Sequence, residues 1–380
     1  MAPASTPQAA RAVFARAYAA PFEAALAHKA NGGRVVGYMS ANAPVELIEA
    51  AGMFALRLDG GGITETPRTD AFMERLFAPT VRGVSERLLS GELDFLDAVI
   101  LPRTTDSVQR LYYYLCEQQR TGAAALPALI LYDLLHTPWY SSAEHNFRSL
   151  TRVHKALSTL AGVQIDDAML AAAIEKSNAR RAALEACTAA RRTSPPGMTG
   201  VEALQLFAAA QRLSPDAFIE ASRNWRAAPG AAGAPRLVLA GNAPDTEDLH
   251  RAIEAAGAVV VGDYHDRGDL SIGAPIAQDL PPLRALNEHY HRHTRSVRTF
   301  PAHAEAVAAF AKSAGADGVV FFFYAEEEVL TWEYPGQQRA LEAAGLPSIG
   351  LVAQPYTPDA TSVQAAVEPL LRAIRERGAA

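Results

Sequence analysis

The chain has 380 residues, of which 49% are hydrophobic and 20% are charged, and its formal net charge is −6. This length exceeds one ordinary hydrophobic core, so two or three domains are expected. The acidic balance gives no reason to expect nucleic acid or an anionic membrane surface as a partner. With only two cysteines, Cys116 and Cys187, the chain alone cannot form a disulfide framework or a four-cysteine metal site.

The alanine-rich segment 9–30 carries charged residues along its length. This pattern predicts an amphipathic helix and not a signal peptide. The longest apolar runs, such as 318–324, are far shorter than the roughly 20 residues that a membrane span needs. Together with the few cysteines, these features predict a cytoplasmic protein.

From residue 34 onward, apolar strand patterns alternate with helical periodicity. Strands are expected at Arg34–Met39, Phe54–Leu58, Ala98–Leu101 and Ala128–Tyr132, and helices at Val45–Ala51, Val81–Leu89 and Ser107–Gln119. Continuous Val, Ile and Leu strands joined by helical crossovers predict a parallel, doubly wound sheet.

A long helical region follows over 142–225, broken at Gly162 and at the turn 194–197, and the Ala, Gly and Pro-rich segment 227–235 reads as a linker. A second α/β region then begins. Its expected strands are Arg236–Ala240, Ala258–Val261, Gly318–Phe323 and Ser348–Val352, and its expected helices are Thr246–Ala255, Pro301–Ala314, Gly336–Ala344 and Thr361–Arg377. We therefore predict an α/β fold with two Rossmann-like or flavodoxin-like parallel-sheet lobes (1–141 and 231–380) and a helical region (142–230) between them.

Ligands of open α/β sheets bind outside the carboxyl ends of the strands. After the first strand come Ser40 and, in the first turn of the next helix, Glu46. Ser40 is a candidate for contact with a substrate carbonyl or phosphate at a helix N-terminus. The structural alternative is that Ser40 or Asn42 caps the helix and Glu46 complements its dipole.

The loop after the third strand carries further candidates for substrate contact. Thr105 and Asp106 are expected to face a ligand, and Arg103 suits a phosphate or carboxylate. The alternative is that Asp106 or Ser107 caps the following helix. Glu326, just beyond the most apolar strand, is either a proton donor or acceptor with a raised pKa or an acid that favours a helix start.

The histidine run 289–293 (HYHRH) would place three imidazoles on one face if it were extended, as a metal site needs. The neighbouring Arg292, Arg295 and Arg298 would repel a cation, so we predict no metal site and expect these arginines to suit the phosphates of a ligand such as coenzyme A. The sequence lacks the motifs GxGxxG, GxxxxGK[ST], GxSxG and HExxH. It therefore does not predict a phosphate-binding nucleotide loop, the nucleophile turn of an α/β-hydrolase or a zincin metal site.

The segment 34–58 (RVVGYMSANAPVELIEAAGMFALRL) resembles the opening βαβ unit of the 2-hydroxyacyl-CoA dehydratase family, which includes the benzoyl-CoA reductase subunits. Four later segments are similar to family passages in the same order along nearly the whole chain. They are FAPTVR (77–82) with LLSGELDFLD (88–97), LPRTTDS (101–107), PPGMTG (195–200), and 316–347 from ADGVV to AGLP. Ser40 and Glu46 match the family's first-loop pattern, so the resemblance implies substrate or catalytic roles for them.

The resemblance implies a two-subunit enzyme whose subunits resemble each other and which an ATP-driven activator supplies with one low-potential electron. The enzyme forms a ketyl radical on an acyl-CoA thioester. Family cysteines from three loops hold an iron–sulfur cluster, and here the corresponding positions are Ala78, Thr105 and either Tyr324 or Ala325. Because such clusters need thiolates, we expect no cofactor in this chain and a [4Fe-4S] cluster only in a partner subunit.

Three hypotheses follow. In the first, this chain is a cluster-free subunit that acts on an acyl-CoA thioester beside a homologous, cysteine-bearing partner. In the second, it has the same fold but is a non-catalytic scaffold that binds acyl-CoA or another anion. The third, a hydrolase or lyase built on Ser40, Asp106, Glu326 and the histidines, has no support from residue spacing.

Overall fold

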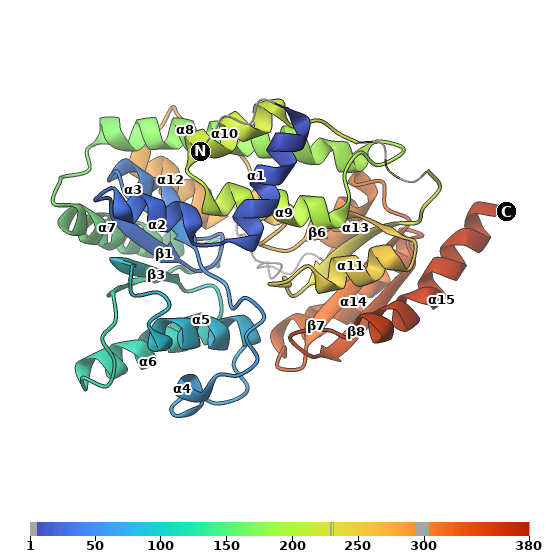
Figure 1. The fold of residues 1–380 in the computed structure, drawn as a ribbon, viewed down its shortest axis with the longest axis horizontal. Coiled ribbons are helices and arrows are strands. Elements are labelled where there is room, and N and C mark those ends of the chain that lie inside the picture. The colour runs from blue at the N-terminus through green and yellow to red at the C-terminus, as the bar shows by residue number, and fades with distance from the viewer. Residues whose placement is uncertain (1–5, 229, 231, 293–303, 380) are drawn as a thin grey trace. The chain divides into compact units, whose positions relative to one another are not determined.

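The computed structural model describes residues 6–228, 230, 232–292 and 304–379 (Figure 1). Over these residues the chain forms two compact units. The first comprises Met1–Ala183, Ala208–Asn224 and Gly273–Arg295, and the second comprises Leu184–Phe207, Trp225–Ile272 and Ser296–Ala380. The helical region 142–230 therefore contributes residues to both units.

The first unit contains a four-stranded sheet, here sheet A, with the strand order β2-β1-β3-β4. Its strands are β1 (Val35–Tyr38), β2 (Phe54–Arg57), β3 (Ala98–Pro102) and β4 (Ala128–Tyr132). All pairings are parallel, with Tyr38 opposite Ile100 and Pro102 opposite Tyr132. The predicted parallel, doubly wound sheet is confirmed.

Successive side chains of sheet A enter two different cores, because neighbouring residues of a strand point to opposite faces. Val36, Ala98 and Ile100 pack in a core that includes residues of α3 (Val45–Ala50), α7 (Tyr140–Ala161), α8 (Asp167–Thr188) and α12 (Pro282–Arg292). Val35, Val99 and Leu101 pack in a core with α2 (Glu23–Ala30), α5 (Pro79–Ser90) and α6 (Asp106–Arg120). Both faces are covered, which explains why these strands are apolar throughout.

The second unit contains sheet B, whose order β6-β5-β7-β8 repeats that of sheet A. Its strands are β5 (Arg236–Gly241), β6 (Val259–Tyr264), β7 (Gly318–Tyr324) and β8 (Ser348–Gln354). One core joins the sheet to α11 (Asp248–Ala255) and α15 (Ala360–Ala379), and the other joins it to α13 (Ala304–Ser313) and α14 (Val329–Ala343). The second predicted lobe is thus also a doubly wound parallel sheet.

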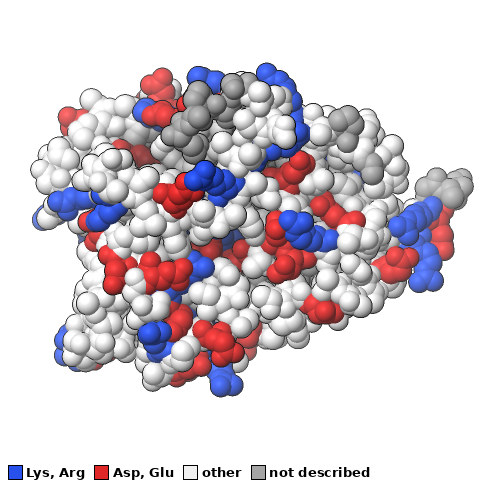
Figure 2. All heavy atoms as spheres, viewed as in Figure 1, with Lys and Arg blue, Asp and Glu red and all other residues white. Residues whose placement is uncertain are grey.

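The remaining elements are short or belong to the helical region: α1 (Pro7–Ala19), α4 (Pro67–Asp70), η1 (Ala189–Arg192), α9 (Gly200–Arg212), α10 (Pro215–Asn224) and η2 (Asp269–Ser271). Among the described residues, no helix is both long and apolar enough to cross a bilayer. Acidic and basic side chains are interspersed over the face shown in Figure 2.

Three local expectations need correction. The single helix expected over 9–30 is two helices, because Pro21 interrupts the hydrogen-bond ladder between α1 and α2. The histidine run is helical up to Arg292, so His289 and His291 do not share the face that an extended strand would give them, and His293 lies outside the described residues. The helix expected from Gly336 begins at Val329, where Glu327 Oε1 accepts hydrogen bonds from the amides of Val329 and Leu330 at 2.8 Å each.

Candidate functional site

The carboxyl edge of sheet A, meaning the end where its strands finish, has its topological switch point between β1 and β3. The chain leaves β1 through α3 on one face and leaves β3 through α6 on the other face. Loops that diverge in this way leave a crevice at which α/β proteins bind ligands. Ser40 follows β1 and Arg103 follows β3, so the sequence placed both candidates at this edge.

Ser40 has a left-handed backbone, with a φ of 66°. A non-glycine residue in this region carries about 1–3 kcal/mol of strain, and such strain collects at functional loops. Its hydroxyl oxygen accepts a hydrogen bond from the Asn42 amide at 3.2 Å, and its side chain is partly exposed. The expectation that Ser40 or Asn42 caps α3 is wrong: Pro44 occupies the N-cap position and no side chain caps this helix.

Glu46 is fully buried at the start of α3 and is surrounded by donors from distant segments. Its Oε1 accepts hydrogen bonds from Ser177 Oγ and Arg181 Nη2 at 2.7 Å each, and its Oε2 accepts one from the Tyr290 hydroxyl at 2.7 Å.

Burial alone would raise the pKa of Glu46, but Arg181, His289 and these hydrogen bonds outweigh it and hold the pKa at about 2. Glu46 is therefore an anion at neutral pH. It joins α3 to α8 and α12.

Thr105 and Asp106 stand at the start of α6. Thr105 occupies the N-cap position, and its Oγ1 accepts a hydrogen bond from the Val108 amide at 3.3 Å. The cap is thus one residue earlier than the expected Asp106 or Ser107. Asp106 is exposed in the first turn, where a carboxylate favours the helix dipole.

A cluster that the sequence did not reveal surrounds Arg103. Asp133 directly follows β4, and its two carboxylate oxygens lie 3.3 Å from Arg103 Nη1 and 3.0 Å from His145 Nε2. A carboxylate oxygen accepts hydrogen bonds, so His145 donates to Asp133 from Nε2. The signal available in the sequence was a lone Asp at the end of a buried strand, and nothing in the spacing linked it to His145.

The described part of the second unit places Glu326 and Glu327 after β7. Glu327 precedes the N-cap residue Glu328 of α14, its Oε1 accepts from the first two amides of the helix, and its Oε2 accepts a hydrogen bond from Asn242 Nδ2 at 2.7 Å. Glu326 Oε2 is buried, and no described donor reaches it. Tyr324 ends β7, and burial raises the pKa of its phenol well above the usual value. The helix-start role that the alternative gave to Glu326 thus belongs to its neighbour Glu327.

The positions that the family resemblance assigns to cluster cysteines do not fit an iron–sulfur cluster. Ala78 is at the N-cap of α5, Thr105 is at the N-cap of α6, and Ala325 follows β7. None of these side chains is a thiol, and clusters are held by thiolates. Cys116 lies 11 residues along α6 from Thr105, or about 16 Å at 1.5 Å per residue, so it cannot substitute. Cys187 is buried, which raises the pKa of its thiol to about 11.

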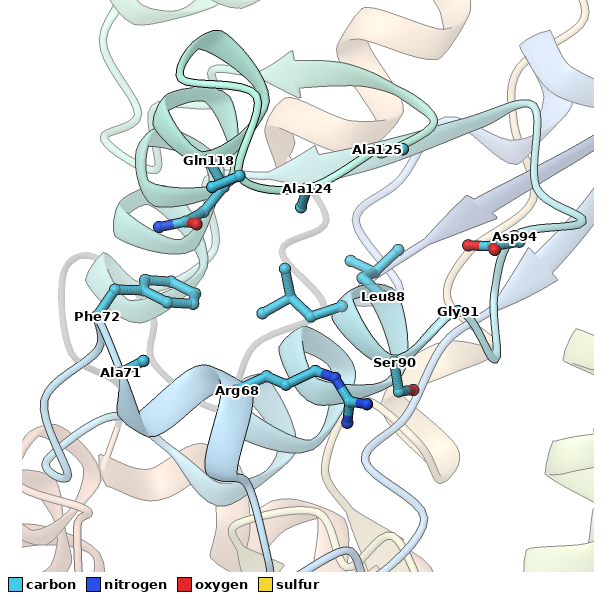
Figure 3. Close-up of a pocket in the computed structure, with 12 residues that line it drawn as sticks. Arg68, Ala71, Phe72, Leu88, Ser90, Gly91, Asp94, Gln118, Ala124 and Ala125 are labelled. Atoms are coloured by element: carbon cyan, nitrogen blue, oxygen red, sulfur yellow. The ribbon is translucent and has the colours of Figure 1, made fainter.

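A separate hollow of about 720 Å³ lies in the first unit (Figure 3). Its lining includes Leu88, Ser90 and Gly91, just before β3, and Ala124 and Ala125, just before β4. These segments lie at the amino ends of the strands, opposite the edge that carries Ser40 and Arg103. None of the candidate site residues lines this hollow.

Two parallel four-stranded sheets of the same order, each with helices on both faces and polar loops at its carboxyl edge, define a Rossmann-like α/β protein of two units. The family model described as 2-hydroxyglutaryl-CoA dehydratase, D-component, matches residues 40–374. The chain belongs to this family, which confirms the resemblance drawn from the sequence.

Several curated relatives extend this result. The chain is 24% identical over 370 residues to (R)-2-hydroxyglutaryl-CoA dehydratase, subunit beta, of Acidaminococcus fermentans, covering 93% of this chain and 96% of the relative. It is 23% identical over 356 residues to the (R)-phenyllactyl-CoA dehydratase beta subunit of Clostridium sporogenes, covering 89% and 92%. It is 35% identical to a benzoyl-CoA reductase subunit of Thauera aromatica over 79 residues, or 20% of each chain.

Proposed function

We propose that this protein is a cluster-free subunit of a hetero-oligomeric enzyme that acts on an acyl-CoA thioester. Two observations support the proposal: the family match over residues 40–374, and the absence of cysteine at Ala78, Thr105, Tyr324 and Ala325, where the resemblance implies three thiolates, the third at either Tyr324 or Ala325. The relatives are named as subunits of dehydratases and of a reductase of CoA thioesters, which supports a partner subunit and this class of substrate.

In this proposal the partner is a homologous subunit with cysteines in all three loops. It carries the [4Fe-4S] cluster and receives electrons from an ATP-dependent activator. This chain contributes the carboxyl edge of sheet A, where Ser40 contacts the thioester ligand and Arg103 contacts an anionic group. Thr105, Asp106 and Glu326 are the further candidates for ligand contact, and the low pKa of Glu46 supports a role as a fixed charge that holds α3 and its Ser40 loop.

The test is anaerobic co-purification of this chain with its homologous partner, followed by iron and sulfide analysis of each separated chain. We expect iron and sulfide in the partner alone, and turnover of a 2-hydroxyacyl-CoA or aromatic acyl-CoA only when both chains and the activator are present. About one cluster per copy of this chain, purified by itself, would disprove the proposal.

The missing thiolates also favour a second candidate, a non-catalytic scaffold that binds acyl-CoA or another anion. The same reconstitution separates the two. If the partner and activator turn over the substrate equally well without this chain, while the isolated chain still binds acyl-CoA in calorimetry, the scaffold is the better description.

A further inference from the structure

Arg103, Asp133 and His145 form a cluster at the carboxyl edge of sheet A, and hydrogen bonds of the backbone hold two of them in place. The Arg103 amide donates to the Tyr132 carbonyl at 2.9 Å, and the Asp133 amide donates to the hydroxyl of buried Ser149 at 2.9 Å. These contacts fix the backbone of both residues, and the Asp133 carboxylate contacts both the guanidinium and the imidazole.

This cluster has more donor capacity than its internal contacts use. A guanidinium has five N–H donors, and the 3.3 Å contact with Asp133 engages one of them weakly. The Arg103 side chain is 37% exposed, so a ligand in solvent can reach the remaining N–H donors of its guanidinium. Arg148 is exposed one helical turn after His145 on α7 and forms no ion pair with another described residue. Asp106, exposed three residues after Arg103, adds a second carboxylate, so this surface offers unused guanidinium donors and not an excess of positive charge.

Two exposed aromatic side chains lie at the junction of the β4–α7 connection with α7. Trp139 is 60% exposed and Tyr140 is 81% exposed, immediately before and at the start of α7. His136, three residues before Trp139, donates from Nε2 to the Arg103 carbonyl at 3.0 Å, which ties this connection to the loop after β3. An exposed aromatic ring on one of two linked loops and a guanidinium on the other suit a planar base with attached phosphates, since the ring stacks on the base and the guanidinium pairs with phosphate.

Building on the proposed function, we propose that this surface binds the nucleotide half of coenzyme A. Trp139 stacks on the adenine, and Arg103 and Arg148 contact the phosphates, with Asp133 as a positioning residue for Arg103. The acyl group itself offers neither a base nor a phosphate, so it is the nucleotide half that matches this chemistry. Because β1 and β3 are paired, the thioester end of a ligand held here can extend along the same edge towards the Ser40 loop.

Tryptophan fluorescence tests the stacking contact. The chain has three tryptophans, of which Trp225 is buried and Trp332 is 86% exposed, so the measurement uses a Trp332→Phe background. The probe is adenosine 3′,5′-bisphosphate, which lacks the acyl and pantetheine parts. We expect it to quench the fluorescence, and we expect a further Trp139→Phe change to abolish the quenching. Quenching that survives Trp139→Phe would overturn the stacking contact.

Calorimetry with coenzyme A on the full chain tests the phosphate contacts. Arg103→Ala and Arg148→Ala should each weaken binding about tenfold and reduce its dependence on salt, whereas Arg103→Lys should restore only part of the loss because it lacks the fork. The matched control is Arg120→Ala, which removes an exposed arginine of α6 and should leave affinity unchanged.

Coenzyme A binding of full strength in all the Arg103, Arg148 and Trp139 variants would overturn this site and leave the proposed function standing. Failure of the wild-type chain, alone and with its partner, to bind coenzyme A would overturn both.

Discussion

The Tyr290 hydroxyl donates a 2.7 Å hydrogen bond to Glu46 although the two residues are 244 positions apart. The same carboxylate accepts from Ser177 and Arg181, so three segments of the first unit meet at one buried charge. A buried carboxylate with this many donors is stable only as an anion. Removal of the Glu46 carboxylate should therefore lower the stability of the fold and disturb the position of α3, the helix that follows the Ser40 loop.

Glu46→Gln should destabilise the protein by about 3–5 kcal/mol, because it leaves Arg181, whose side chain is only 13% exposed, without its counter-charge. Urea unfolding followed by circular dichroism measures the change. The matched control is Glu117→Gln, which removes an exposed partner of Arg120 and should cost about 0–1 kcal/mol. An unchanged unfolding midpoint for Glu46→Gln, together with lost turnover in the reconstituted enzyme, would instead assign Glu46 to the chemistry.

The contribution of Glu46 should also depend on pH. Its pKa is about 2 in the folded protein and 4.5 in the reference state, so the unfolded chain takes up this proton first as pH falls. The stabilisation is fully present above pH 4.5 and is lost as pH falls towards 2. We expect the stability gap between wild type and Glu46→Gln to narrow across this window. A gap that stays constant down to pH 2.5 would contradict the ion pair.

Ser40→Gly and Ser40→Ala both remove the hydroxyl, but only glycine accepts a φ of 66° without strain. We expect the Gly variant to be about 1 kcal/mol more stable than the Ala variant. If the hydroxyl contacts the thioester ligand, both variants should lose turnover to the same extent. Equal stability would show that the loop relaxes on substitution.

Asn146 fixes the connection that carries Trp139. Its fully buried amide accepts from the Leu135 amide at 2.7 Å and donates to the Leu135 carbonyl at 2.9 Å. Asn146→Ala should cost about 2–3 kcal/mol, because both backbone groups lose their partner, and should speed hydrogen exchange at the Leu135 amide. Asn31→Ala, which removes an exposed amide bonded to the Ala27 carbonyl, is the control and should change little. Unaltered exchange at Leu135 would show that the connection is held elsewhere.

Wild-type protein should not hold an iron–sulfur cluster by itself, because Ala78, Thr105, Tyr324 and Ala325 carry no thiolate. We expect the isolated chain, incubated anaerobically with iron and sulfide and then desalted, to retain neither. Iron and sulfide analysis together with the visible absorption spectrum measures the outcome. Stable uptake of a cluster by the wild-type chain would contradict the expectation.

The eight strands were predictable because each is a short apolar run with helical pattern on either side, a property of local sequence. The bounds of β4 agree with the prediction, and those of the other strands differ by one to three residues. Helix α12 was not among the expected elements, although Leu286 and Tyr290 follow helical spacing. The hydrogen bonds of Ser40 and the cap at Thr105 depend on backbone angles that residue type alone leaves open.

By itself, the sequence determined the two parallel sheets, the family, the absence of thiolates at three loops and the strand ends that carry Ser40 and Arg103. Only the tertiary structure decided which groups meet there. Glu46 finds its partners 131, 135 and 244 positions away, and Arg103 shares Asp133 with His145. The physical reason is that the spacing of apolar residues that predicts a strand or a helix lies within a few neighbouring positions. Ion pairs and hydrogen bonds between distant segments depend instead on how packed helices align across the core.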